Sequence, residues 1–149
     1  MRRMTPLQQP RVLELEIESD TAQLSPLREK LRAFLKETGL EPKVQESILV
    51  ALGEACTNSI RHSYSNKPGH KVRVKAEDLP EKVVFKVRDF GDKIDLTKLE
   101  TPPTLPPVKP GGLGIYFMRT IMDEVEYNTA LSEGNELILV KLKKGESRR

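Results

Sequence analysis

The 149-residue sequence contains a single cysteine, Cys56, and no apolar run that approaches the roughly 20 residues needed to cross a bilayer. One cysteine excludes an internal disulfide framework and is typical of a protein from a reducing cytosol. No apolar stretch follows Met1-Arg2-Arg3-Met4, so we expect no signal peptide, no membrane contact and a cytoplasmic location. The length is that of one domain with a real core.

A large excess of charge of one sign is also lacking, because 25 Lys and Arg residues stand against 22 Asp and Glu residues, a formal net charge of +3. We interpret residues 144–149 as a solvated basic tail. Aromatic residues do not interleave with the basic ones and no nucleic-acid-binding motif is present, so we expect no direct contact with nucleic acid. The sequence Gly-x-x-x-x-Gly-Lys-Ser/Thr is absent, which excludes a P-loop.

Hydrophobic periodicity predicts the order β-α-α-β-β-loop-α-β-β over residues 11–143, after a flexible lead-in at 1–10. The second and third strands should form an antiparallel hairpin, and the last strand should lie inside the sheet. This order predicts a single α/β two-layer sandwich, with a mixed sheet and helices on one face. The expected strands are 11–17, 71–76, 83–88, 126–130 and 136–142, and the expected helices begin near Asp20 or Ser25, at Pro42 and at Gly111.

Glu54 and Asn58 lie four residues apart in the long helical pattern of about 44–64, and are therefore neighbours on one helix face. They fall beside the apolar stripe, where side chains face the rim of a cavity. A carboxylate in such a place can accept a proton, and an amide oxygen can complete the ligand shell of Mg²⁺. On this helix alone, an amphipathic helix with polar residues at its boundary is the simpler interpretation.

Asp89 has the same parity as Val83, Phe85 and Val87, so its carboxylate points to the apolar side if the strand reaches it. A buried carboxylate needs a partner. Asp89 either ends the strand and caps a turn with Gly91, or accepts a hydrogen bond from the amine of a buried ligand.

The segment that follows, at about 92–110, includes five prolines between residues 102 and 110 and cannot be a helix or a central strand. Such a long loop is either functional or a surface excursion. Gly111-Gly112-Leu113-Gly114 then opens a helix that should bury Ile115, Met118 and Val125. Glycines at a helix start offer N–H groups to phosphate oxygens, although they also mark ordinary loop ends. Lys109, just before them, could reach a terminal phosphate.

The stretches around Glu54–Asn58, Asp89–Gly91 and Gly112–Gly114 resemble the N, G1 and G2 boxes of the GHKL ATPase superfamily, in the same order and at similar separations. The run Gly-Leu-Gly-Ile-Tyr-Phe-Met-Arg-Thr-Ile-Met-Asp-Glu-Val-Glu-Tyr is similar to the anti-sigma factor serine/threonine kinases of bacterial partner-switching systems. The resemblance covers about residues 12–143. It implies the Bergerat ATP-binding fold of the histidine-kinase-like ATPases, with ATP and Mg²⁺ as cofactors.

The resemblance also implies roles for individual residues. Asn58 would hold Mg²⁺, Glu54 would be the general base, and Asp89 would bind the exocyclic amine of adenine, with Gly91 giving the base room. The remaining cofactor-binding positions would be Lys109, Gly112, Gly114 and Gly134, with 92–110 as the ATP lid.

Two positions depart from the family pattern. Lys93 stands where many members carry a second glycine, and Gly134-Asn135 stands where the family usually has Gly-Thr. These departures put in doubt the close approach of the loop to the base and a threonine contact.

The implied function is phosphorylation of a serine or threonine on an anti-anti-sigma (STAS-type) protein, together with binding of a sigma factor or another regulatory protein. A homodimer is left open. A second hypothesis is a binding module that has lost catalysis and acts by partner exchange. A third, the catalytic domain of a histidine kinase, would need an upstream phosphoacceptor helix pair for which the chain before Glu54 is too short.

Overall fold

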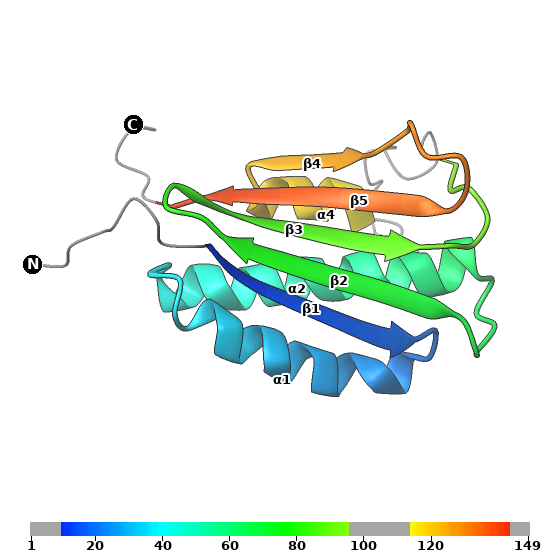
Figure 1. Ribbon diagram of the computed structural model, residues 1–149, viewed down its shortest axis with the longest axis horizontal. Coiled ribbons are helices and arrows are strands. Elements are labelled where there is room, and N and C mark those ends of the chain that lie inside the picture. Colours follow the sequence, from blue (N-terminus) through cyan, green and yellow to red (C-terminus); the bar gives the residue numbers. More distant parts are fainter. Residues whose placement is uncertain (1–9, 96–113, 144–149) are drawn as a thin grey trace, which may run out of the picture.

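The computed structural model describes residues 10–95 and 114–143, and all statements below concern these residues. Five strands form one sheet in the order β1-β2-β3-β5-β4 (Figure 1). Their bounds are Arg11–Glu18 for β1, Lys71–Asp78 for β2, Lys82–Asp89 for β3, Glu124–Tyr127 for β4 and Asn135–Leu142 for β5.

The expectation of a mixed sheet is wrong, because every pair of neighbouring strands is antiparallel. The crossover through the third helix does make β3 and β4 run in the same direction, but β5 lies between them. The predicted β2–β3 hairpin and the interior position of β5 are both confirmed.

Three α-helices cover one face of the sheet, which confirms the two-layer sandwich (Figure 1). They are α1 (Leu24–Leu35), α2 (Pro42–Asn58) and α4 (Gly114–Ile121), and α2 contacts both of the others. A short 3₁₀ helix, η1 (Thr21–Gln23), precedes α1, and the Asp20 side chain caps it by accepting the Ala22 N–H at 3.0 Å. No helix in the described part of the chain is long and apolar enough to cross a membrane.

The core lies between the sheet and the helices, as the alternation in the strands requires. Phe85 in the middle of β3 and Leu139 opposite it on β5 are completely buried, and α2 places Ile48 and Leu52 against the sheet layer. Cys56 is also buried there, and burial raises the pKa of its thiol to about 12, so it acts as a small packing residue.

The third helix is shorter than the periodicity predicts, and Val125 lies in β4 rather than on that helix. The cause is the early start of sheet pairing at Asp123. Its N–H donates to the Val140 carbonyl at 2.9 Å, and its carboxylate accepts the Leu142 N–H at 2.7 Å. Strand β4 therefore both begins and ends at an earlier residue than the predicted strand 126–130, although the two ranges overlap. Val125 still faces the core.

Candidate functional site

Asp89, the last residue of β3, points to the helix side and is 1% exposed. Its Oδ1 accepts the Gly91 N–H at 3.1 Å and the Asn135 amide at 3.0 Å, and its Oδ2 accepts the Ser63 hydroxyl at 2.8 Å. A carboxylate offers about four lone-pair positions. Asp89 thus caps the turn with Gly91, as one of the two interpretations expected, and still has an acceptor position left on Oδ2.

Asn135 begins β5 directly opposite Asp89 in the β3–β5 register and is 7% exposed. Its amide nitrogen lies 2.8 Å from both the Ser63 hydroxyl and the Asp92 carbonyl, and its Oδ1 accepts the Ile94 N–H at 3.0 Å. A single amide side chain therefore connects the Asp89 carboxylate to the backbone that follows β3. The sequence comparison treated Asn135 only as a departure from the family pattern and gave it no role.

Gly91 and Gly134 allow chain segments to approach the Asp89 region closely. A Cβ added at Gly91 would lie 2.7 Å from both the Ser63 carbonyl carbon and Tyr64 Cδ1. Gly134 has φ +70°, and a Cβ there would lie 2.8 Å from the Phe90 Cα. Side chains are therefore excluded at both positions by the fold itself, independently of any ligand.

The segment after α2 is a π-helix, η2 (Ser59–Ser63), in which the Tyr64 N–H donates to the Ser59 carbonyl at 3.1 Å. It buries Ser63 against Asp89. The Tyr64 hydroxyl accepts the Phe90 N–H at 2.7 Å and donates to the Lys71 carbonyl at 2.6 Å. Burial, and then the Asp89 charge, raise the pKa of Tyr64. Single π-turns are common at functional sites.

Sequence reasoning missed Ser63, although a signal was present. Ala55, Ser59 and Ser63 continue the apolar stripe of α2 at steps of four residues. A serine on a buried stripe needs a hydrogen-bond partner, and Asp89 was the buried acceptor that strand parity predicted.

Asn58, the last residue of α2, is 1% exposed, and neither atom of its amide group has a hydrogen-bond partner among the described residues. A buried amide without partners costs free energy, so it is unusual unless a ligand satisfies it. Glu54 lies one turn earlier, is partly buried, and forms no hydrogen bond or ion pair within the described ranges. The two predicted neighbours on α2 thus have free polar groups.

Tyr127 on β4 connects Asn58 with the Asp89 region. Burial raises the pKa of its hydroxyl, the Asp89 charge raises it further, and a weak interaction with the Asn58 side chain, which does not reach hydrogen-bond geometry, lowers it. In the described part of the chain, no group of three His, Cys, Asp or Glu residues could hold a metal ion.

The other predicted positions are distributed as follows. Gly114 is the first residue of α4. Lys109, Gly112 and most of the predicted lid lie outside the described residues, so those assignments stay predictions. Lys93, the second departure from the family pattern, donates its ammonium group to the Leu131 carbonyl at 2.7 Å, which ties the start of the predicted lid to the β4–β5 turn.

The Asn135→Asp variant tests whether this network depends on an uncharged donor beside Asp89. Two adjacent carboxylates raise each other's pKa in the folded state, so the protein loses stability as the pH rises. We expect a loss of about 2–3 kcal/mol at pH 8 that shrinks towards pH 5, measured by urea unfolding at both pH values. Asn66→Asp, in an exposed loop, is the control. An equal loss for Asn135→Asp at both pH values would contradict this account.

Comparisons with known proteins agree with this geometry. A sequence profile described as the histidine kinase-like ATPase domain matches residues 17–141. The serine-protein kinase RsbW of Bacillus velezensis is 28% identical over 141 residues, which cover 90% of this chain and 87% of the relative. The anti-sigma F factor of Clostridium beijerinckii is 30% identical over 119 residues, which cover 76% of this chain and 82% of the relative.

Among solved structures, the catalytic domain of the histidine kinase ThkA matches with a TM-score of 0.53 and 16% identity, covering 87% of this chain and 98% of that chain. This likeness confirms the predicted histidine-kinase-like fold. The predicted resemblance to anti-sigma factor kinases is confirmed by the relatives. The chain therefore belongs to the histidine kinase-like ATPase family, together with RsbW serine-protein kinases and anti-sigma F factors.

Proposed function

We propose that this chain is an ATP-dependent serine/threonine protein kinase and anti-sigma regulatory factor. It phosphorylates an anti-anti-sigma partner of the STAS type and binds a sigma factor or another regulatory protein, in the cytoplasm. The names of its relatives support this proposal, and the family to which it belongs binds ATP. The single observation that carries it is the buried amide of Asn58, which makes no hydrogen bond of good geometry to any described residue and lies one turn after the Glu54 carboxylate.

Asp89 is proposed to recognise the base. Its remaining acceptor position on Oδ2 suits a ligand N–H donor, because an ionised carboxylate only accepts hydrogen bonds. The 6-amino group of adenine is such a donor, whereas the 6-oxo group of guanine would place an acceptor against it. The carboxylate is held in one orientation by Ser63, Gly91 and Asn135. Binding of the base therefore costs little further side-chain conformational entropy at Asp89.

Asn58 and Glu54 are proposed to serve the phosphoryl transfer itself. Asn58 Oδ1 fits Mg²⁺, and gains the partner that it otherwise lacks. Bound Mg²⁺ would supply neutralisation of phosphate charge, on which such transfers mainly depend. Glu54 accepts the proton of the incoming serine or threonine hydroxyl as general base.

The glycines and Lys109 complete the proposed cofactor site. Gly112 and Gly114 would offer backbone N–H groups to the phosphates, and Gly114 begins α4, where the helix dipole favours negative charge. Lys109 contributes charge to the terminal phosphate. Gly134 contributes indirectly, through its close packing against the backbone of Asp89.

The second candidate is a binding module that acts by partner exchange without catalysis. One observation favours it: Asn135 and Lys93, the two departures from the family pattern, are both engaged in contacts within the chain. An Asp89 region held by the protein itself could keep its shape without nucleotide.

The Glu54→Gln variant separates these two functions. Loss of the general base should lower phosphoryl transfer by about 100-fold or more, because positioned bases contribute 10²–10⁴, while ATP affinity changes little. Transfer of labelled γ-phosphate to an anti-anti-sigma protein measures the rate, and calorimetry measures the affinity. Glu46→Gln, on the same helix and ion-paired with Arg32, is the matched control. Transfer by Glu54→Gln at the wild-type rate would contradict the role of Glu54 as general base, and absence of transfer by the wild type would contradict the kinase proposal and favour the binding module.

The Asn58→Leu variant tests whether the unpartnered amide is kept for a ligand. Leucine has a similar volume and no polar atoms, so the nucleotide-free protein should gain about 1–2 kcal/mol of unfolding free energy. The stabilisation that MgATP gives the wild type should be lost. Thermal unfolding with and without MgATP measures both effects. A nucleotide-free variant less stable than the wild type would mean that the amide has a structural partner instead.

A further inference from the structure

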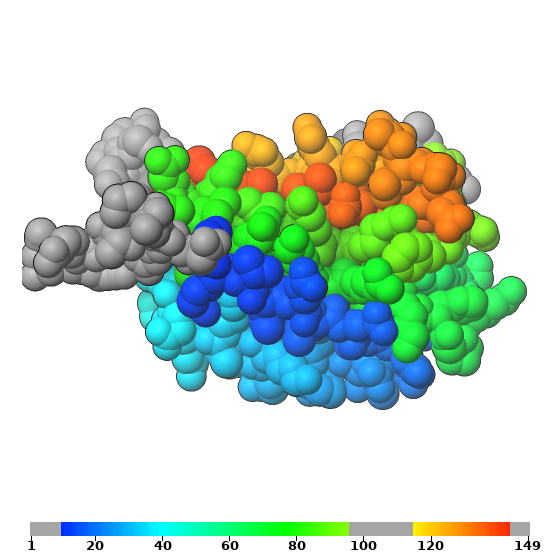
Figure 2. All heavy atoms as spheres, viewed as in Figure 1, coloured from blue at the N-terminus to red at the C-terminus, as the bar shows by residue number. Residues whose placement is uncertain are grey.

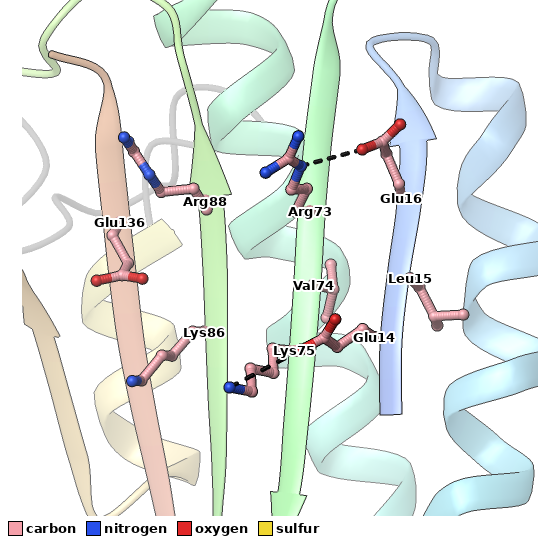
Figure 3. A pocket seen from close by; sticks show the side chains of 9 residues that line it. All are labelled: Glu14, Leu15, Glu16, Arg73, Val74, Lys75, Lys86, Arg88 and Glu136. Carbon is pink, nitrogen blue, oxygen red and sulfur yellow. Dashed lines mark hydrogen bonds and ion pairs between the residues drawn. The ribbon is translucent and has the colours of Figure 1, made fainter. Parts of the chain in front are cut away.

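The face of the sheet opposite the helices carries an ordered pattern of charge. Figures 1 and 2 look onto this outer face, and no described helix covers it. The strand register aligns its side chains in two rows across β1, β2 and β3, and both rows read acid, base, base. They line a shallow groove of about 440 Å³ (Figure 3). One row is Glu16, Arg73 and Arg88, and the other is Glu14, Lys75 and Lys86.

This arrangement places like charges directly opposite each other on the two central strands. Arg73 of β2 is the register partner of Arg88 on β3, and Lys75 is the partner of Lys86. Like charges in opposite positions destabilise a sheet. Strand pairing alone therefore does not explain the opposition of like charges at these two positions, and a function outside the fold can explain it.

Among the described residues, carboxylates form ion pairs with the two β2 cations but not with the two β3 cations. Glu16 pairs with Arg73 at 3.0 Å, and Glu14 lies 3.9 Å from the Lys75 ammonium (Figure 3). Lys86 has no ion pair or hydrogen bond in the described part of the chain.

Among the described residues, Arg88 likewise forms no ion pair with a carboxylate. Its guanidinium donates to the carbonyls of Asp89 at 2.7 Å, Glu133 at 3.2 Å and Asn135 at 3.3 Å. Glu136, its neighbour in the register, instead accepts the Asn128 amide at 3.1 Å. The two cations on β3 thus have no carboxylate partner in the part of the chain that the structure describes.

An exposed aromatic ring ends this row of cations. Phe90 follows β3, is 39% exposed, and lies 4.3 Å below the Arg88 guanidinium and 5.2 Å from that of Arg73. Exposed aromatic rings next to arginines are typical of protein interaction surfaces. The ring adds an apolar anchor to a charged surface.

We propose that the cationic strip, consisting of Arg73, Lys75, Lys86, Arg88 and Phe90, binds a narrow acidic segment of a partner protein. An extended segment with carboxylates at alternate positions matches Lys86 and Arg88, which are two residues apart on one strand face. An apolar side chain next to them would contact Phe90. Charge complementarity of this kind sets partner choice and association rate.

The flanking glutamates define the width of the occupant. Glu14 and Glu16 lie on one side of the strip and Glu136 on the other. They repel a broad acidic surface and leave room for a single chain. A second copy of this protein, docked face to face about the strip, would bring cations against cations. The proposal goes beyond the kinase function and needs no nucleotide, so the two can fail separately.

Binding of a fluorescein-labelled hexaglutamate peptide, followed by fluorescence anisotropy at low salt, tests the proposal. We expect the wild type to bind hexaglutamate and not to bind a labelled hexalysine peptide. Lys86→Glu should weaken binding by about tenfold or more, because it reverses the least compensated charge of the strip. Glu14→Lys should strengthen binding, since it extends the strip onto β1.

The matched control is Lys43→Glu, which makes the same charge change at the start of α2, on the helix layer. Equal weakening by Lys43→Glu and Lys86→Glu would reduce the effect to net charge and overturn the proposal. Absence of hexaglutamate binding to the wild type would overturn it as well. Sedimentation equilibrium tests the alternative occupant. If the wild type is a dimer and Lys86→Glu dissociates it, this face is a contact between two copies of the chain, and the proposal is overturned.

Discussion

The buried carboxylate of Asp89 is the constraint on which the site end of this fold depends. A charge with 1% exposure is stable only if donors surround it. Those donors come from three separate segments: Ser63 from the π-helix, Gly91 from the turn after β3, and Asn135 from the start of β5. The requirement to satisfy one carboxylate therefore fixes where α2, β3 and β5 meet.

Close packing around that carboxylate accounts for the local sequence. Gly91 and Gly134 are glycines because backbone lies where their side chains would be. The π-turn adds a residue to the helix, and Ser63 then faces Asp89. The hydrogen bonding of this region is nevertheless incomplete. Asp89 keeps one free acceptor position, and the Asn58 amide makes no hydrogen bond of good geometry to the described residues. Native proteins commonly retain such unfavourable groups where a ligand uses them.

Strand β3 carries two different chemistries on its two faces. Asp89 points to the helix layer, while Arg88 and Phe90, its neighbours in sequence, lie together on the outer face. The alternation of a strand is enough to separate them. Arg88 also binds the carbonyls of Asp89 and Asn135, so the two faces share one hydrogen-bonded strand end.

Sequence periodicity predicted the local features of the structure well. The parity of Val83, Phe85 and Val87 put Asp89 on the buried side, as observed. The spacing on α2 put Glu54 and Asn58 at the rim of the apolar stripe, where Glu54 is partly buried but Asn58 is as buried as the core. The roles of these residues stay proposals.

The sequence predictions that proved wrong or incomplete depend on contacts between residues far apart in the chain. The direction of strand pairing depends on β5 lying between β3 and β4, which no window of sequence contains. The role of Asn135 depends on contacts with Ser63, Asp89 and the segment after β3, up to 72 residues away. Val125 was misplaced because sheet hydrogen bonds at Asp123, not helix signals, end α4.

Calorimetric titration of MgATP into the wild type and into Asp89→Asn tests the central claim most directly. The asparagine keeps the shape of the side chain and removes its charge, and Asp20→Asn, an exchange between two good helix caps, is the control. The account predicts binding by the wild type and by Asp20→Asn, and its loss in Asp89→Asn. Absence of binding to the wild type, or equal binding by all three proteins, would contradict it.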